Sequence, residues 1–353
     1  MLSVAFFKLN LLFTRYLNVL IVLSVIVMWF LFKNVFNFTS EYSHSAVKSF
    51  DEPIIFIGGS YRSGTTLMRV MLDAHPQIRC GEETRIIPRF LEFITRNMET
   101  DKKLEGAGIT KEILTVAANA FISSIVNLHG KLAPNLCTKD PENLRYSKFL
   151  AQLFPSSKFI LLIRDARAVV NSIMTRGLSA GGYSPDYKRN FFNWNRLMED
   201  MYSQCQSIGP DRCLPVYYEQ LVLHIEKEMK NILSFLNIPW HKDVLQHEQL
   251  IGSEIKLAKV EMSSDQVVKP VNLEGLDSWF GNIPDEVLDK IDTYAPMLKK
   301  LGYDTKSKRP NYGEADQRIK DNTLHIQQNR QMFIDIAKNH SDDRFHKFFD
   351  RSV

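Results

Sequence analysis

The residues best suited to chemistry lie in a short segment, Arg62 to Thr66, near the start of the globular part of the chain. The segment carries a guanidinium, the hydroxyls of Ser63, Thr65 and Thr66, and Gly64, whose backbone is free to turn. An arginine presents a planar fork of donors that matches phosphate oxygens. An apolar run precedes the segment and a helical pattern follows it, so unpaired backbone N–H groups and a positive helix end converge there. The sequence therefore predicts an anion-binding loop.

This loop is close to the Walker A motif of nucleoside triphosphatases, except that Thr65 stands at the position of the motif's lysine. That lysine reaches the outer phosphates of ATP or GTP, so its absence argues against a kinase or an NTPase. An ordinary strand-to-helix turn rich in small residues is the simpler alternative. The strand predicted before the loop and the helix predicted after it favour the anion site.

A second group of polar residues follows a later apolar run. Arg164 lies where that run ends and a helix begins, Ser172 lies two helical turns further on, and Arg176 lies one turn beyond. Residues at this spacing share one helical face, so the three side chains can meet one ligand. The alternative is a charge pair of Arg164 and Asp165 at a helix start.

Two neighbouring carboxylates, Glu82 and Glu83, precede a helical pattern that carries Arg85 and Arg89. Either glutamate can act as a general base, and the residue chemistry alone does not choose between them. The two arginines lie on one helical face and suit a ligand that carries acidic residues. A solvated charged face is the alternative for this group.

Short apolar runs alternate with helical patterns along the chain, which is typical of a parallel sheet covered by helices on both faces. The sequence predicts an α/β protein with buried strands at residues 54–57, 158–163 and 213–218. Helices are expected at residues 113–128, 142–153, 187–205, 221–236 and 284–301, and a further one near 322–338. Residues 254–283 are expected to be irregular.

The N-terminal segment of residues 16–32 contains no charged residue and approaches the length that crosses a membrane. No small-residue cleavage site follows it, so a retained signal-anchor is favoured over a removed signal peptide. Asn37 and Asn339 begin glycosylation sequons, which matter only in the secretory lumen. We therefore expect a single-pass protein with a lumenal globular part. A buried N-terminal helix of a soluble protein is the alternative.

The expected organisation is a cytoplasmic tail at residues 1–15, the membrane segment at 16–32, a stem at 33–52, a lumenal domain at 53–304 and a polar, peripheral tail at 305–353. A chain of 353 residues can hold one large α/β domain. The net charge of +4 is too small to predict a nucleic-acid partner. The cysteines form no CxxC pair and the histidines no HExxH motif, so no metal site is expected.

The segments YRSGTTLMRVMLDAHPQIRCGEETR, CTKDP, LLIRDARAVVNS, SSDQVVKPVN and SWFGNIP occur in this order along the chain. Together they resemble the tyrosylprotein sulfotransferase family over residues 54–304. The resemblance implies a type II Golgi membrane enzyme, a homodimer, with a lumenal domain built on a P-loop-like parallel sheet. It also implies transfer of a sulfuryl group from 3′-phosphoadenylyl sulfate (PAPS) to tyrosine hydroxyls in acidic segments of secreted and membrane proteins, without a metal in the chemical step.

The resemblance assigns the donor to two anion sites. The loop from Arg62 to Thr66 matches the family's site for the 5′-phosphosulfate, and Arg164, Ser172 and Arg176 match positions that the family uses for the donor, with the 3′-phosphate at Arg164 and Ser172. Further matches are Tyr218, Ser264, Asp265, Gln266, Val267, Val268, Lys269, Pro270, Val271 and Asn272. In one departure, Ser278 stands where the family commonly has a lysine, which leaves one cation fewer for the 3′-phosphate.

The acceptor chemistry demands a base that acts during the transfer. A phenol has a pKa near 10 and a free carboxyl group one near 4.3, so complete proton transfer before attack would cost about 8 kcal/mol. The proton must therefore leave as the oxygen–sulfur bond forms. By resemblance the base is Glu83, and Lys139 and Ser263 stabilise the charge that grows on the bridging oxygen. From the residues alone, Ser264 remains an alternative to Ser263, and a surface ion pair with Asp140 remains one for Lys139.

The resemblance also covers the peptide site and the cysteines. The family's peptide-contacting positions match Arg85, Ile86, Ile87, Pro88 and Arg89. Its disulfide pairing implies bonds Cys80–Cys137 and Cys205–Cys213, of which the first ties the segment of Glu83 to that of Lys139.

Two other functions are compatible with these motifs. A Golgi carbohydrate sulfotransferase would use the same donor with a sugar hydroxyl as acceptor. A non-catalytic lumenal protein would use the anion pocket to hold sulfated or phosphorylated ligands, and the presence of Glu83, Lys139 and Ser263 argues against it.

Overall fold

The computed structural model describes residues 24, 28–29, 52–100, 102–177 and 184–340. Residues 51–353 belong to one compact unit, and residues 1–50 belong to another. The expected cytoplasmic tail and the sequon at Asn37 lie outside the described residues, as do nearly all of the expected membrane segment and stem. Within the described ranges, no helix combines the length and apolar character needed to span a bilayer.

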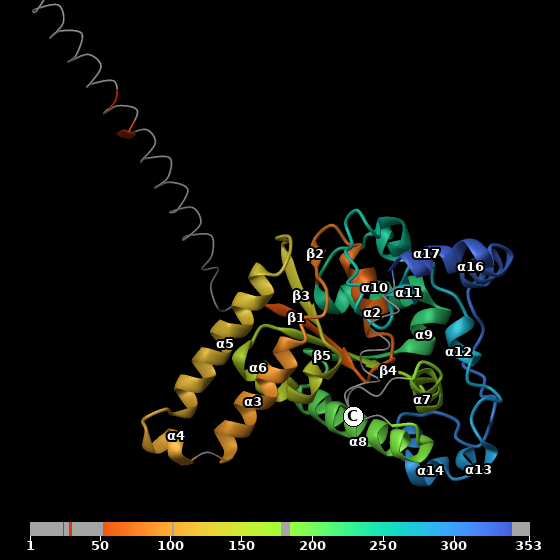
Figure 1. Cartoon of the computed structure of the whole chain (residues 1–353), viewed down its shortest axis with the longest axis horizontal. Helices are drawn as coiled ribbons and strands as arrows, with labels where there is room; N and C mark the ends of the chain where they lie inside the picture. The colour runs from red at the N-terminus through yellow and green to blue at the C-terminus, as the bar shows by residue number, and fades with distance from the viewer. Residues whose placement is uncertain (1–23, 25–27, 30–51, 101, 178–183, 341–353) are drawn as a thin grey trace, which may run out of the picture. The chain divides into compact units, whose positions relative to one another are not determined.

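The unit is organised around a parallel sheet with the strand order β2-β3-β1-β4-β5 (Figure 1). The apolar runs at residues 54–57, 158–163 and 213–218 form strands as predicted, because both faces of each strand are covered by helices. The bounds are β1 (Ile54–Gly59), β2 (Ile78–Arg79), β3 (Asn135–Lys139), β4 (Lys158–Ile163) and β5 (Cys213–Tyr217).

The sequence did not predict β2 and β3, which are short and carry polar residues. β3 forms because its backbone pairs in parallel with that of β1. Ile54 lies opposite Leu136, and Ile57 lies opposite Lys139. The register matters for function, because it brings Lys139 to the carboxyl end of β3, level with the end of β1. Carboxyl ends of parallel strands are where such folds bind ligands.

Alternate residues of β1 enter two different apolar cores. Phe56 stacks on Phe159 of β4, with ring centroids 5.3 Å apart, in the core that α3, α5, α7 and α8 cover. Ile57 enters the core beneath α2, α9 and α10. The bounds are α2 (Thr65–Asp73), α3 (Ile86–Thr100), α5 (Lys111–Leu128), α7 (Ala166–Thr175), α8 (Tyr187–Ile208), α9 (Tyr218–Leu223) and α10 (Ile225–Leu236).

Three predicted helices are wrong in extent. Residues 142–153 form a 3-10 turn and a helix, η1 (Pro141–Tyr146) and α6 (Ser147–Leu153), and residues 221–236 divide at His224 into α9 and α10. Residues 284–301 form α13 (Asp285–Leu288), α14 (Ile291–Tyr294) and α15 (Met297–Lys300). Pro296 explains the last break, because a proline disfavours helical geometry in the residue before it. The remaining short helices are α4 (Lys102–Gly106), η3 (Lys242–Leu245), η4 (His247–Leu250), α11 (Ser264–Val267) and α12 (Glu274–Asp277).

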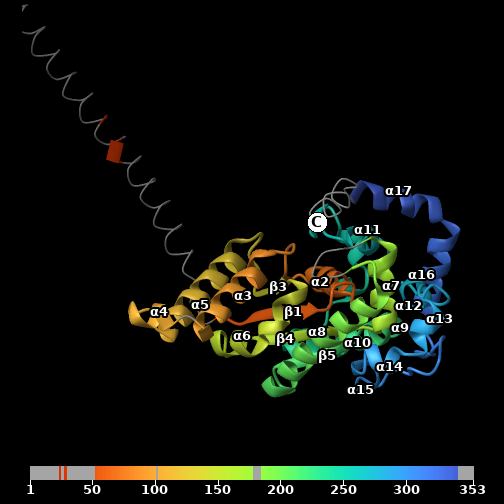
Figure 2. The same cartoon turned by 60° about the horizontal axis from the view of Figure 1, so that its bottom comes forward.

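Residues 305–340 are not the peripheral tail that their composition indicated. One predicted helix is two, α16 (Gln317–Gln328) and α17 (Arg330–His340), and α17 lies beside α11 in both views (Figures 1 and 2). Ile319 is 0% exposed and Ile326 is 1% exposed. A single apolar stripe on an otherwise polar helix is enough to join α16 to the core.

The predicted disulfides Cys80–Cys137 and Cys205–Cys213 are both present. The first joins the residue after β2 to the middle of β3, and the second joins the end of α8 to the start of β5. The Cys80–Cys137 bond therefore ties the chain just before Glu83 to the strand that carries Lys139.

Candidate active site

The anion-binding loop lies between β1 and α2, and two residues in it have left-handed backbone geometry. The φ angle is 68° at Arg62 and 96° at Gly64. A Cβ atom on Gly64 would lie 2.4 Å from the ring of Tyr218, so both the backbone and the packing require glycine. The turn directs the N-terminus of α2 into a cavity.

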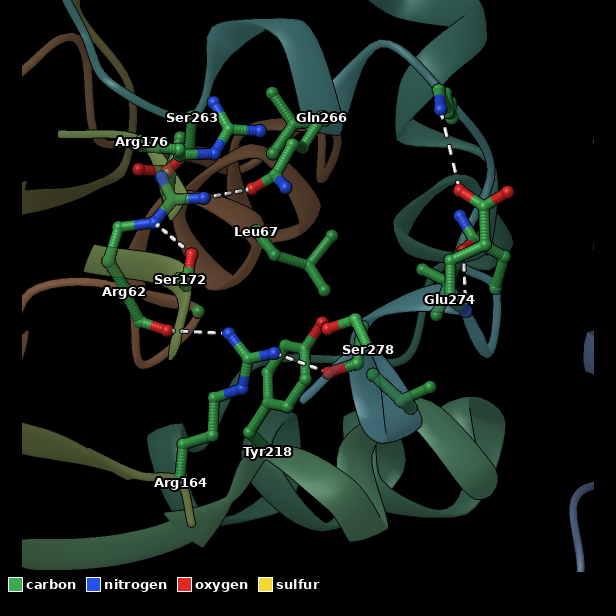
Figure 3. Close-up of a pocket in the computed structure, with 18 of the residues that line it drawn as sticks. Arg62, Leu67, Arg164, Ser172, Arg176, Tyr218, Ser263, Gln266, Glu274 and Ser278 are labelled. Carbon is green, nitrogen blue, oxygen red and sulfur yellow. Dashed lines mark hydrogen bonds and ion pairs between the residues drawn. The ribbon is translucent and has the colours of Figure 1, made fainter. Parts of the chain in front are cut away.

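Arg62 links the loop to two other segments that border the cavity (Figure 3). Its Nε donates to Ser172 Oγ at 2.9 Å, one Nη donates to Ser263 Oγ at 2.5 Å, and the other donates to Gln266 Oε1 at 2.5 Å. The side chain is buried. A guanidinium with three polar partners in three directions is held rigidly, which suits an anion clamp.

The cavity has a volume of about 440 Å³, within the usual range for a small-molecule site. Most of the predicted donor residues line it, and so do Leu67, Asn171 and Ser278, which were not predicted to bind the donor. The predicted residues in the lining are Arg62, Gly64, Thr66, Arg164, Ser172, Arg176, Tyr218, Ser263, Gln266, Val267, Lys269, Pro270, Val271 and Asn272.

Five predicted donor residues do not line the cavity. Ser264 is fully buried and donates to the carbonyl of Ala258 at 2.9 Å, so its hydroxyl is occupied elsewhere, whereas Ser263 faces the cavity. Asp265 pairs with Arg176 at 2.9 Å. The others are Ser63, Thr65 and Val268, whose side chains are buried.

Positive charge is concentrated at the cavity. Burial, together with the nearby charges of Arg176 and Arg164, lowers the pKa of Arg62 to about 9. Arg164 donates to the carbonyl of Arg62 at 2.7 Å and stacks over the ring of Tyr218 at 4.3 Å. Among the described residues, its buried Nε has no hydrogen-bond partner. Crowded guanidiniums and an unpaired buried donor fit a ligand with several negative charges.

A second group of charges lies beside the loop, centred on Lys139. The ammonium is fully buried and donates to Thr66 Oγ1 at 3.1 Å, to the carboxylate of Glu83, and to Glu261 Oε1 at 3.3 Å. Thr66 also lines the cavity. Lys139 therefore connects Glu83 to the anion loop, and Glu83 is not a solvated surface residue.

The geometry distinguishes the two neighbouring glutamates. Glu83 bonds to Lys139, while the carboxylate of Glu82 is 3.9 Å from the ring of His129. Asp140 accepts from the Thr84 hydroxyl at 2.6 Å and from the Arg85 N–H at 2.8 Å. The ion pair of Lys139 with Asp140 considered from the sequence is not formed, because the Asp140 carboxylate instead holds the turn that follows Glu83.

Glu261 was missed by the sequence analysis. It is buried, accepts from the N–H of Glu83 at 2.9 Å, and pairs with Arg69 of α2 at 2.8 Å. Burial opposes ionisation, but Lys139 and Arg69 prevail and hold the pKa of Glu261 at about 2. Its segment has no regular pattern, so the only signal was the closeness of Glu261 to Ser263 along the chain.

The predicted peptide-contacting residues lie at and before the start of α3. Arg85 is half-buried, with its Nε 3.8 Å from Glu83, and Arg89 is exposed. Ile86 is exposed, and Pro88 is half-buried. Ile87 packs in the core, so its side chain is not available to a bound peptide.

A parallel sheet whose first strand leads through an arginine-bearing loop into a helix, with a second arginine group after β4, defines the sulfotransferase fold. The sulfotransferase domain of the curacin biosynthetic pathway matches 71% of this chain and 98% of its own length, with a TM-score of 0.50 at 19% identity. The sulfotransferase domain of the Synechococcus PCC 7002 olefin synthase matches with a TM-score of 0.52 at 22% identity, over 72% of this chain and 95% of its own.

Sequence comparison identifies the family of sulfotransferases to which the chain belongs. The model of the sulfotransferase family matches residues 53–242. Protein-tyrosine sulfotransferase A of Caenorhabditis elegans is 50% identical over 78% of this chain and 74% of its own length. Protein-tyrosine sulfotransferase 2 of Gallus gallus is 50% identical over 81% and 78%, and protein-tyrosine sulfotransferase 1 of Homo sapiens is 48% identical over 82% and 80%. The chain belongs to the protein-tyrosine sulfotransferase family.

Proposed function

We propose that this chain transfers the sulfuryl group of PAPS to tyrosine hydroxyls of protein substrates, with Glu83 as the general base. The observation that carries the proposal is the continuous series of contacts from the cavity to a carboxylate, through Thr66, Lys139 and Glu83. Family membership supports the reaction class, and this series supports the roles of the residues.

The donor carries negative charge at two separated ends, and the cavity offers cations in two places. The loop with Arg62 and the N-terminus of α2 suits the 5′-phosphosulfate, because backbone N–H groups and the helix dipole favour an anion there. Arg164, Ser172 and Arg176 suit the 3′-phosphate end. Ser278 lines the cavity with a hydroxyl, so the arginines carry the phosphate charge without a lysine at that position.

The acceptor oxygen attacks sulfur as the sulfur–oxygen bond to the donor phosphate breaks, and its proton passes to Glu83. In this proposal Lys139 meets the negative charge that grows on the leaving oxygen, assisted by Ser263, which lines the cavity. Thr66 and Glu261 keep the ammonium in position while Glu83 changes partner. Arg85 and Arg89, beside the base, suit a tyrosine flanked by acidic residues.

The decisive experiment compares Glu83→Gln with Glu82→Gln, using labelled PAPS and both acidic tyrosine peptides and glycans as acceptors. We expect Glu83→Gln to lower kcat by at least about 10²-fold with little change in donor affinity, because the amide cannot accept the proton while Lys139 keeps Thr66 and Glu261 as partners. Glu82→Gln is expected to retain turnover. Wild-type turnover in Glu83→Gln would show that the base is misassigned, and transfer to glycans alone would show the acceptor class to be wrong.

We also propose that the enzyme is a single-pass type II Golgi membrane protein with residues 53–340 in the lumen, anchored by residues 16–32. The uncharged segment and the two disulfides support this, because disulfides persist in oxidising compartments. Asn339 is exposed on α17, where a glycan is accessible. Endoglycosidase digestion of Asn339→Gln and Asn37→Gln variants tests the topology. The proposed homodimer rests on family resemblance, and light scattering of the lumenal part tests it.

A further inference from the structure

Three residues that line the donor cavity are each followed in the chain by a residue that enters one buried polar network. Arg164 precedes Asp165, Tyr218 precedes Glu219, and Ser278 precedes Trp279. Asp165, Glu219 and Trp279 are all buried. At three places, therefore, a residue that lines the cavity and a residue of the network are neighbours in the chain. A shift of the network would move the adjoining cavity wall.

Residues of the C-terminal region complete this network. The hydroxyl of Tyr312 donates to Asp165 Oδ2 at 2.8 Å and accepts from Trp279 Nε1 at 3.3 Å. The hydroxyl of Tyr303 donates to Glu219 Oε2 at 2.8 Å, and the other oxygen of Glu219 accepts from the N–H of Asp165 at 2.9 Å. Tyr312 thus contacts two of the three residues directly.

One buried cation pairs with Asp165 and also holds the C-terminal region. Arg167 pairs with Asp165 at 2.7 Å, stacks on Trp279 at 4.5 Å, and donates to the carbonyls of Asp304 and Ser307 at 2.9 and 2.8 Å. Burial and the neighbouring Asp165 raise the pKa of Glu219 to about 7. Asp165 accepts hydrogen bonds from Arg167 and Tyr312, and Glu219 accepts them from the Asp165 N–H and from Tyr303, so each carboxylate depends on a tyrosine hydroxyl.

A second, separate contact reaches another wall of the cavity. On α16, Asn322 donates to the carbonyl of Val271 at 2.9 Å, and Thr323 Oγ1 accepts from the N–H of Leu273 at 3.1 Å. Val271 and Asn272 line the cavity. The region after residue 302 therefore supports the donor cavity on two sides.

We infer that Tyr312 and Asn322 are positioning residues for the donor, and that residues 303–323 are a structural part of the donor site. Tyr312 fixes the starts of α7 and α9, and with them the guanidinium of Arg164 and the ring of Tyr218. Asn322 fixes the wall at Val271. The inference rests on the proposed use of this cavity for PAPS.

The test is Tyr312→Phe in the whole protein, with Tyr187→Phe as the matched control. Tyr187 likewise donates a hydrogen bond to a residue distant in the chain, at the carbonyl of Asn282, and among the described residues it makes no hydrogen bond to the network. We expect Tyr312→Phe to raise the Kd for adenosine 3′,5′-bisphosphate, measured by calorimetry, at least about fivefold. The KM for PAPS is expected to rise in parallel, while kcat at saturating donor and the KM for the peptide stay within about twofold of the wild type. Tyr187→Phe is expected to leave all four values unchanged.

An unchanged Kd in Tyr312→Phe, or an equal loss in Tyr187→Phe, would overturn the inference. If Tyr312→Phe does not fold, Asn322→Ala tests the inference instead. We expect its Kd for adenosine 3′,5′-bisphosphate to rise, and an unchanged Kd would contradict the proposal. Failure of the proposed function is recognised separately, because wild-type protein would then bind the bisphosphate without transferring a sulfuryl group, or would not bind it.

Discussion

Lys139 has two carboxylate partners with different tasks. Glu83 has 14% of its side chain exposed, whereas Glu261 has 1% exposed and has a second cation in Arg69. In the proposed mechanism Glu83 meets the acceptor, and Glu261 retains the ammonium. A lysine with one fixed and one exchangeable partner can turn toward a leaving oxygen without losing all compensation of its charge.

Replacement of Glu261 by Gln tests this division. We expect kcat to fall about tenfold or more with little change in donor Kd, because Lys139 would then keep only the Thr66 hydroxyl and Glu83 of its three described partners and would compete for the base. Asp73→Asn is the control, since Asp73 is the other partner of Arg69 but does not contact Lys139. Equal losses of kcat in both variants would assign the effect to Arg69.

The same variant changes how stability depends on pH. The pKa of Glu261 is lowered from 4.5 to about 2, so its contribution to the free energy of unfolding is present above about pH 4.5 and is lost as the pH falls toward 2. We expect the wild type to lose more stability than Glu261→Gln across this window in urea unfolding series. Parallel curves would show that folding does not lower the pKa of Glu261.

At the scale of elements, the turn between β1 and α2 depends on a close approach. Gly64 combines a positive φ angle with contact to the ring of Tyr218 at the start of α9. The turn therefore has no space for a side chain at residue 64 beside the start of α9, and α9 is in turn attached to the buried network through Glu219.

Gly64→Ala is expected to weaken donor binding at least about tenfold, because the added methyl group forces either the loop or the Tyr218 ring to move. Gly108→Ala is the matched control. Gly108 also has a positive φ angle, of 79°, but nothing lies near its added Cβ, so it measures backbone strain alone. Calorimetry with adenosine 3′,5′-bisphosphate and thermal unfolding of both variants separate the two effects, and equal losses of affinity would contradict the steric explanation.

At the scale of the whole molecule, the two disulfides have different consequences. The Cys80–Cys137 bond spans 57 residues of sequence, and the Cys205–Cys213 bond spans 8. In the chain-entropy description the first contributes about 4 kcal/mol and the second about 2.6 kcal/mol. Only the first also joins the segment of Glu83 to the strand of Lys139.

Paired Ser replacement of Cys80 and Cys137 is therefore expected to lower both the free energy of unfolding and kcat. The corresponding variant of Cys205 and Cys213 is expected to lower stability alone, by a smaller amount. Denaturant unfolding and steady-state kinetics below the unfolding temperature check this. A selective loss of kcat in the Cys205–Cys213 variant would contradict the proposed coupling.

Local patterns of residue type and spacing contain much of the information about this protein. The run at 54–57, the turn after it and the helical spacing beyond identify an anion loop, because strand burial, glycine freedom and helix ends act over a few residues. The chain order of the motifs is enough to indicate the family. The same reasoning does not identify β3 or the packing of residues 305–340. These segments are polar in composition, and their two or three apolar residues give too weak a pattern to predict burial.

Long-range contacts settle the rest. Glu83 is distinguished from Glu82 by its ion pair with Lys139. Ser263 is distinguished from Ser264 because Ser263 lines the cavity, whereas the Ser264 hydroxyl donates to the carbonyl of Ala258. Glu261 and Tyr312 are invisible in the sequence, since each acts through partners more than a hundred residues away. Residue type and spacing set what a short segment can bind. Tertiary packing alone determines which distant charges meet in a buried place, because the cost of an unpaired buried charge applies only once the chain has folded around it.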